Sequence, residues 1–184
     1  MRIERLRNEQ NVKINWVHFP LHPETPEQGQ SIAELFAGRD LDLEAMHARM
    51  QALMDEEGLP YASRSHTFNS RLAQELAKWA DTQPQGEQIH EALFKAYFVN
   101  GQNIADTAIL LEIAAGVGLP VKEAKDVLVQ RLFKGAVDED WSRSRAYGIS
   151  GVPTFVAGGY GVTGAQPYST LVQFVEHVKQ GRAS

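Results

Sequence analysis

Two short runs rich in β-branched and aromatic residues, Thr154–Ala157 and Tyr160–Thr163, are separated only by Gly158 and Gly159. Tight two-residue hairpin turns need positive φ, which glycine adopts freely, so this spacing predicts a β-hairpin. A helical pattern that can be capped at Ser169 follows the hairpin. Its apolar positions share one face: Leu171, Phe174, Val175 and Val178. The C-terminal part of the chain is therefore predicted to run strand, turn, strand, helix.

One more strand is predicted near the N-terminus, over residues 12–19. The side chains alternate between two faces, and the β-branched and aromatic content is typical of a strand. Pro20, Pro23 and Pro26 end the strand and start an extended loop. Residues 1–8 have the pattern of the tail of a helix.

The middle of the chain is predicted to be helical, because apolar residues recur there at helical spacing. The predicted helices begin near Ser31, Asp42, Asn69, Gln88, Asp106, Val121 and Asp138. The first has the capping-box pattern, in which Ser31 and Glu34 satisfy each other's backbone amides. Because these helices lie between one strand and a hairpin, the order suggests a helical domain inserted into an α/β unit.

The 184 residues include no cysteine, which excludes disulfides, Cys-ligated zinc, iron–sulfur clusters and thiolate nucleophiles within this chain. The formal net charge is −5 with no basic stripe, so a nucleic-acid partner is not favoured. No apolar stretch approaches the roughly 18 residues of a membrane span. Residues 1–7 are charged and lack the apolar core of a secretory signal. We therefore predict a cytoplasmic protein without a membrane partner.

The segment 148–156, Gly-Ile-Ser-Gly-Val-Pro-Thr-Phe-Val, resembles the cis-proline segment of thioredoxin-fold proteins. The run 161–167, Gly-Val-Thr-Gly-Ala-Gln-Pro, is narrower and resembles the DsbA family, in particular its FrnE-like branch. The resemblance spans nearly the whole chain. It implies an α/β, thioredoxin-like fold with a large helical insertion. The thioredoxin-like domain is expected over 1–27 and 120–184, and the inserted helical domain over 28–119.

The resemblance implies that the bond between Val152 and Pro153 is cis, which costs only about 0.5–1 kcal/mol before proline. From the residues alone, a trans turn opening an edge strand is an equally good interpretation. In the cis form the backbone of Val152 faces the active site, where an extended substrate peptide can add to it as a short strand. Val152 and Pro153 are therefore the predicted substrate-binding residues.

The chain departs from the family pattern at its start. The family opens with a strand and a Cys-x-x-Cys at the beginning of the first helix, where the helix N-terminus lowers the pKa of the first thiol. When the strand at 12–19 is aligned, Met1–Leu6 falls on the tail of that helix, so we expect the first strand and most of the first helix to be missing. No catalytic residue is then predicted within the chain. The strand at 12–19 would lack its inner neighbour, and homodimerisation through the open sheet edge is one expected consequence.

Other side chains that often carry chemistry have simpler interpretations. The six histidines show no clustering with carboxylates, so no metal and no cofactor is predicted. His66 is interpreted as a helix-entry residue, with substrate contact as the alternative. The stripe Met46, Met50 and Leu53 is interpreted as core packing, with a peptide groove as the alternative because methionine adapts to varied partners. The run 138–140, Asp-Glu-Asp, is interpreted as the acidic start of a helix.

The resemblance implies an oxidoreductase acting on protein or small-molecule thiols and disulfides, redox-inactive in this cysteine-free form. Two alternatives stay open. One is a non-redox peptide-binding protein that keeps Val152 and Pro153. The other is a relative of the glutathione-dependent isomerases or kappa-class glutathione transferases. The expected partner is a thiol or disulfide protein or peptide, with glutathione as the small-molecule alternative.

Overall fold

The computed structural model describes residues 2–181 and divides into two compact units. The first consists of Met1–Leu21 and Asp140–Ser184, and the second of His22–Glu139. The division falls inside one helix, α8 (Lys134–Ala146), which contributes its N-terminal part to the second unit and the remainder to the first. The predicted domain boundaries, 1–27 with 120–184 and 28–119, stay a prediction.

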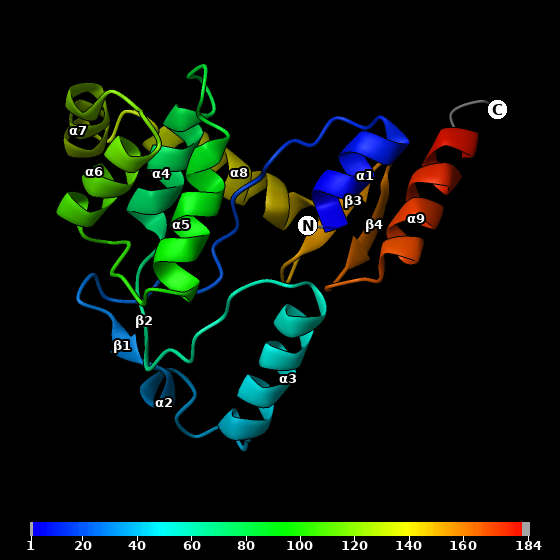
Figure 1. Ribbon diagram of the computed structural model, residues 1–184, viewed down its shortest axis with the longest axis horizontal. Helices are drawn as coiled ribbons and strands as arrows, with labels where there is room; N and C mark the ends of the chain where they lie inside the picture. The colour runs from blue at the N-terminus through cyan, green and yellow to red at the C-terminus, as the bar shows by residue number, and fades with distance from the viewer. Residues whose placement is uncertain (1, 182–184) are drawn as a thin grey trace. The chain divides into compact units, whose positions relative to one another are not determined.

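The first unit is built on the predicted hairpin. Strands β3 (Thr154–Ala157) and β4 (Tyr160–Thr163) pair antiparallel, with Thr154 opposite Thr163 and Ala157 opposite Tyr160. Helices α1 (Arg2–Gln10) and α9 (Tyr168–Gly181) lie beside the hairpin in Figure 1. A small core joins these elements; it consists of buried Leu6, Leu171 and Val175, with Phe155 and Val162 of the hairpin packed against them.

The expectation of a strand over 12–19 is wrong, because the structure has no strand between residues 11 and 29. Strand pairing requires a neighbouring backbone that supplies the ladder of hydrogen bonds. In the described part of the chain, β3 pairs only with β4, and no other strand lies in that sheet. The contacts of the segment include packing of Val12 against the small core of the first unit and a hydrogen bond from the backbone N–H of His18 to the Asp140 carboxylate at 3.0 Å.

The second unit is a helical bundle of α4 (Arg71–Ala80), α5 (Gln88–Phe98), α6 (Thr107–Gly116) and α7 (Val121–Gln130). Helix α4 contributes six of its ten residues to the buried interior. The side chains of Leu76, Ile89 and Leu110 have no exposed surface and form the centre of the core. The apolar periodicity predicted from the sequence thus places the bundle correctly.

Two short strands, β1 (Gln30–Ser31) and β2 (His66–Thr67), pair antiparallel in the second unit and were not predicted. His66 therefore lies in a strand and not at the start of a helix. Helix α2 (Ile32–Leu35) follows β1 and shows the predicted capping box, with Glu34 N–H donating to Ser31 Oγ at 3.1 Å. Helix α3 (Leu43–Glu56) begins at the predicted cap Asp42, which accepts the Ala45 amide at 2.9 Å.

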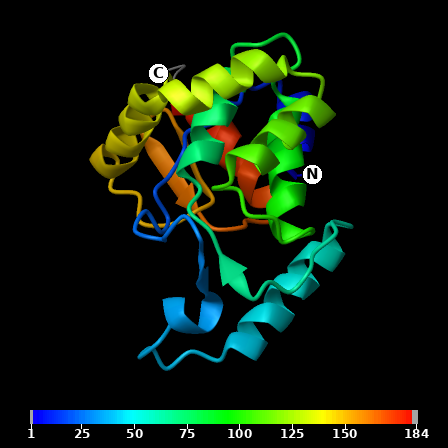
Figure 2. The same ribbon diagram turned by 90° about the vertical axis from the view of Figure 1, so that its left-hand side faces the viewer.

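The interpretation of the methionine stripe of α3 as core packing is wrong, because no residue of this helix is buried. Figures 1 and 2 show α3 separated from the bundle helices of the same unit. Within residues 2–181, no helix combines the length and the apolar character that crossing a bilayer requires.

Candidate functional site

The loop between α8 and β3 begins at a glycine-terminated helix end. Gly148 has φ +65 and its N–H donates to the Arg145 carbonyl at 2.9 Å. The Ile149 amide donates to the Ser144 carbonyl at 3.0 Å. A left-handed residue with these return bonds satisfies the last carbonyls of a helix and turns the chain away from its axis. The segment 149–153 therefore leaves α8 in a fixed direction.

The far end of this loop is anchored to the hairpin. The Val152–Pro153 peptide bond is cis. The Pro153 carbonyl accepts the Gly164 amide at 2.8 Å, which extends the β3–β4 pairing by one contact beyond Thr154 and Thr163. The Thr154 hydroxyl donates back to the Gly151 carbonyl at 2.7 Å. Residues on both sides of Val152 are thus held by hydrogen bonds.

Val152 itself is the exposed point of the loop. Its exposed fraction is 49%, and within residues 2–181 neither its N–H nor its C=O has a hydrogen-bond partner. It lies two residues before β3, whose second edge is paired with no strand in the described range. An extended peptide gains affinity by hydrogen-bonding such a free backbone edge. The arrangement therefore offers a ready donor and acceptor for strand addition.

The site is electrically neutral over a long stretch of chain. Residues 146–175, which include the loop, the hairpin and the first half of α9, contain no Asp, Glu, Lys, Arg or His. The exposed apolar side chains in this stretch include Val156 at 41% and Tyr160 at 50%. The stretch itself therefore offers a ligand backbone hydrogen bonds and apolar contact, and no charged side chain of its own.

The run Gly164–Pro167 connects the hairpin to α9 and fastens α1 to it. Gly164 has φ +94, and the Gln166 side-chain amide donates to the Thr163 carbonyl at 2.6 Å. The Arg2 guanidinium donates to the Gln166 carbonyl at 2.9 Å. This run therefore has a structural role in the part of the molecule described here, since its hydrogen bonds hold three elements together.

The helices of the first unit are also joined by exposed polar contacts. The Tyr168 hydroxyl donates to Glu9 at 2.6 Å, and Arg5 Nε donates to the same carboxylate at 2.8 Å. These two hydrogen bonds, first that from Arg5 and then that from Tyr168, hold the pKa of Glu9 below its ordinary value. The contact fixes α1 against the first turn of α9.

The acidic run 138–140 lies within α8, so the interpretation of it as a helix start is wrong; the helix begins earlier, at Lys134. Its members point apart, as adjacent helical residues must. Asp138 pairs with Arg71 at 2.7 Å and with Lys134 at 2.8 Å. Asp140 is buried and accepts the His18 amide. A paired catalytic role for these carboxylates has no geometric support, because they face different partners.

Sequence reasoning missed one ionic cluster, centred on Glu75. This buried carboxylate accepts from Arg71 Nε at 2.7 Å and from Arg131 Nε at 2.7 Å. Arg131 lies 56 positions away in the chain, and no local pattern links the two. The described residues contain no group of three or more His, Asp or Glu side chains arranged to hold a metal ion.

The chain matches a family model described as the DSBA-like thioredoxin domain over residues 1–176. One relative, the uncharacterized protein YwbO of Bacillus subtilis (strain 168), is 27% identical over 158 residues, which cover 84% of this chain and 76% of that protein.

Solved structures agree with this match. The crystal structure of the probable DsbA oxidoreductase SCO1869 from Streptomyces coelicolor is 25% identical with a TM-score of 0.87, covering 97% of this chain and 82% of that one. A 2-hydroxychromene-2-carboxylate isomerase shares the fold at 18% identity and a TM-score of 0.77, over 99% of this chain and 89% of that chain. The crystal structure of a putative protein disulfide isomerase from Nitrosomonas europaea shares the fold at 19% identity and a TM-score of 0.66. The match covers 98% of this chain and 89% of that chain.

The family match over almost the whole chain and the likeness to a DsbA oxidoreductase agree with the helix, loop, hairpin and helix around Val152. The fold is α/β and thioredoxin-like with a helical insertion, and the protein belongs to the DSBA-like thioredoxin domain family.

Proposed function

We propose that this chain binds extended thiol- or disulfide-bearing peptides by strand addition at Val152, as a FrnE-like member of its family. The proposal rests on one observation. Val152 is exposed, its backbone N–H and C=O have no hydrogen-bond partner among the described residues, and it precedes β3, which is paired along one edge only in that range. Val152 supplies the N–H and C=O that pair with the peptide. Pro153, which has no N–H of its own, holds the loop by accepting the Gly164 amide.

The residues of this chain bind and orient a client but supply no thiolate. None of the 184 residues is cysteine, and dithiol exchange proceeds by attack of a thiolate on a disulfide sulfur. In this form the protein is therefore proposed to be redox-inactive, with peptide binding as the activity that its geometry retains. A sulfur that reacts at the site has to come from the client or from another polypeptide.

A fluorescent eight-residue peptide of alternating Val and Thr, with one central Ser in the place of Cys, tests the proposal by anisotropy. We expect saturable binding that is lost when the peptide is N-methylated along one edge, because methylation removes donors without changing the side chains. This arm involves no change to the protein. Equal binding of the methylated and unmethylated peptides would refute strand addition.

Two protein variants locate the binding. Val152→Pro removes the donor amide, whereas Val152→Ala keeps it and serves as the matched control. We expect at least a tenfold rise in Kd for the proline variant and less than a threefold change for the alanine variant, with unchanged circular dichroism spectra for both. Because residues 146–175 are uncharged, the Kd should be nearly the same at low and high salt.

A glutathione-dependent isomerase function is the second candidate, and the likeness to the 2-hydroxychromene-2-carboxylate isomerase structure favours it. That likeness extends to the fold alone at 18% identity. Retention on glutathione-agarose, released by free glutathione, would support it, and the run Gly164–Pro167 favours the oxidoreductase branch instead. We also propose a homodimer through the open sheet edge, in which the second copy would compete with the peptide for β3, and a cytoplasmic location; sedimentation and cell fractionation test them.

A further inference from the structure

Helix α3 presents an apolar stripe that its own unit covers only in part: Leu43 and Leu53 are half-buried, and the two methionines between them are exposed. The stripe consists of Leu43, Met46, Met50 and Leu53, which repeat at three- and four-residue spacing and so share one face. Met46 is 46% exposed and Met50 is 44% exposed, and no residue of the helix is buried. An isolated helix of this length is only marginally stable in water, so contact with a partner along the stripe would stabilise it.

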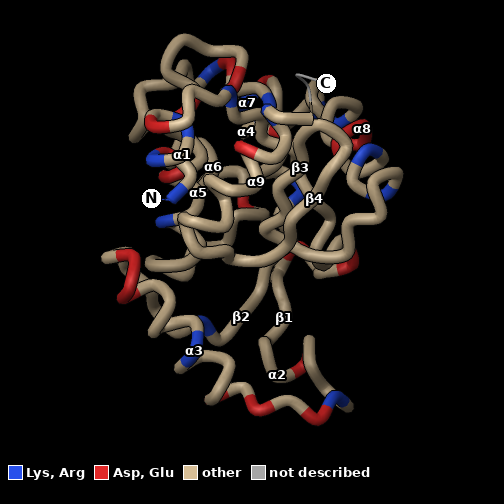
Figure 3. The backbone as a smooth tube through the Cα atoms, turned by 90° about the vertical axis from the view of Figure 1, so that its right-hand side faces the viewer, with Lys and Arg blue, Asp and Glu red and all other residues tan. Residues whose placement is uncertain are grey.

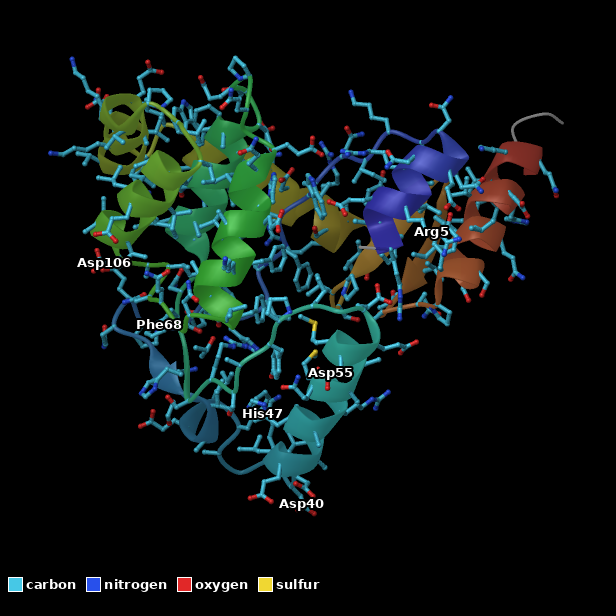
Figure 4. All side chains as sticks on the ribbon, in the orientation of Figure 1. Arg5, Asp40, His47, Asp55, Phe68 and Asp106 are labelled. Atoms are coloured by element: carbon cyan, nitrogen blue, oxygen red, sulfur yellow. The ribbon has the colours of Figure 1, made fainter. Side chains whose placement is uncertain are left out.

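The attachment of α3 through His47 leaves the two methionines accessible. His47 Nδ1 lies 3.1 Å from Tyr61 Oη, and His47 Nε2 lies 3.1 Å from Ser63 Oγ. Figure 4 shows His47 between Asp40 and Asp55, which lie toward the two ends of the helix. The helix is therefore held to the segment 61–63 by polar contacts on one side, while the methionines on the neighbouring face have no such cover.

The same segment carries the negative charge of the chain. Residues 40–57 include six acidic residues and one basic residue, Arg49, whereas the rest of the chain has seventeen of each sign. The entire formal charge of −5 therefore belongs to α3 and its flanks. Figure 3 shows the acidic positions gathered at both ends of the helix. A potential of this sign attracts a cationic partner and repels an anionic one.

We propose that the α3 stripe is a docking site for a basic amphipathic helix, a segment whose apolar face packs on the methionines while its Lys and Arg side chains meet the acidic flanks. Methionine suits this role because its unbranched side chain adapts to different apolar surfaces. Helix-in-groove recognition uses the same combination of apolar anchors and flanking charge. The proposal does not depend on the function of Val152.

Charge decides against two other occupants. A second copy pairing through its own α3 would bring two segments of net charge −5 together, which is unfavourable in either orientation because acidic residues lie at both ends. A membrane surface of anionic lipid would be repelled in the same way. A cationic amphipathic segment is the occupant whose apolar face matches the stripe and whose charge is opposite to that of the acidic residues around it.

The test is anisotropy of a fluorescein-labelled eighteen-residue helix of Leu and Lys, titrated with the full chain. A peptide with the same Leu positions and Glu in place of Lys is the charge control. We expect binding of the Lys peptide, at least tenfold weaker binding of the Glu peptide, and a steep loss of affinity between low and high salt. Equal binding of the two peptides would overturn the proposal.

Substitutions locate the contact. Met46→Gln combined with Met50→Gln removes the apolar surface but keeps good helix formers, and we expect at least a tenfold rise in Kd. The matched control is Val129→Gln combined with Leu132→Gln, two apolar residues exposed at 68% and 59% elsewhere in the same unit. If the control pair weakens binding as much as the α3 pair, the site is not on α3.

A charge pair completes the design. Glu56→Gln with Glu57→Gln, at the C-terminal flank of α3, should raise the Kd severalfold at low salt and leave it nearly unchanged at high salt. The control Glu112→Gln with Glu123→Gln removes the same charge from other helices and should have a smaller effect. Three results would overturn the proposal: self-association that Met46→Gln with Met50→Gln abolishes, binding to phosphatidylserine vesicles in place of the peptide, or unchanged exchange of α3 amides when the Lys peptide is bound.

Discussion

The carboxylate of Glu75 gives the most direct test of how the second unit is held together. Its side chain is fully buried on α4 and receives hydrogen bonds from two guanidinium groups. Arg71 Nε and Arg131 Nη2 lie 2.7 and 2.6 Å from Oε1, and Arg131 Nε lies 2.7 Å from Oε2. Arg131 is the left-handed residue that ends α7, so the cluster ties that helix end to α4.

The expected loss of stability on Glu75→Gln follows from these contacts. Glutamine keeps one carbonyl acceptor, but its amide places donors against Arg131 Nε. Breaking a buried ion pair by removing one partner costs about 3–5 kcal/mol when the remaining charge is stranded. Neither cation is stranded here, because the Arg131 side chain is 42% exposed and Arg71 also pairs with Asp138. We therefore expect a smaller loss, about 2–3 kcal/mol in the free energy of unfolding near pH 7.

The effect should depend on pH with a definite sign. Burial by itself raises the pKa of Glu75, but the hydrogen bonds from Arg131 and Arg71 outweigh burial and bring the pKa below its ordinary value of 4.5. A carboxyl whose pKa is lower in the folded state adds stability above its unfolded pKa and loses it as the pH falls through the folded pKa. The free energy of unfolding of the wild type should thus exceed that of Glu75→Gln by the whole amount near pH 7, and this excess should shrink below about pH 4.5.

Urea unfolding followed by circular dichroism at pH 7 and pH 3.5 measures both expectations. The matched control is Glu123→Gln, which removes an exposed carboxylate from α7 and should change the free energy of unfolding by less than about 0.5 kcal/mol. A loss below 1 kcal/mol for Glu75→Gln, or a difference from the wild type that is the same at both pH values, would refute the assignment of stability to the ionised cluster.

Three further changes test other parts of the fold. Gly158→Ala should cost about 1–3 kcal/mol by thermal melting, because Gly158 has φ +57 and an added Cβ would lie 2.8 Å from Val178 Cγ1; a neutral effect would contradict this geometry. Leu110→Ala should cost about 2–5 kcal/mol, since Leu110 is fully buried in the bundle core, and a loss below 1 kcal/mol would mean that the core collapses onto the site. Ser31→Ala should speed amide exchange in α2 while global stability falls by about 1 kcal/mol or less; unchanged exchange of the Glu34 amide would exclude the observed cap.

Features that short stretches of chain determine by themselves could be predicted from the sequence. The Gly158–Gly159 turn gives the hairpin, and both residues have positive φ as expected. The caps at Asp42 and Asp106 depend on a side chain and an amide two or three positions later, and both are present. The position of Val152 before β3 follows from the same local order.

Features that depend on a distant partner could not be predicted. The alternation in 12–19 is typical of a strand, but a strand forms only where another backbone completes the ladder, and the described sheet supplies none there. The pair β1–β2 joins Gln30 to Thr67, and Arg131 meets Glu75 across 56 positions. The α3 stripe has the periodicity of a core helix, yet periodicity shows only that a helix has an apolar face and not what covers it.

The two proposed binding surfaces differ in charge, so the salt dependence of the Kd distinguishes them. Val152 lies in a stretch without charge, so a peptide that binds there by backbone pairing should have a Kd that salt hardly changes. The α3 stripe lies within residues 40–57, which carry the whole net charge of the chain, so a basic helix bound there should be released as screening shortens the range of attraction. A ligand that loses affinity in salt and still depends on the Val152 amide would show that the two surfaces act on one ligand. Salt titrations of the Val152→Pro variant and of Met46→Gln with Met50→Gln, each with both peptides, would therefore show whether the binding activities are separate.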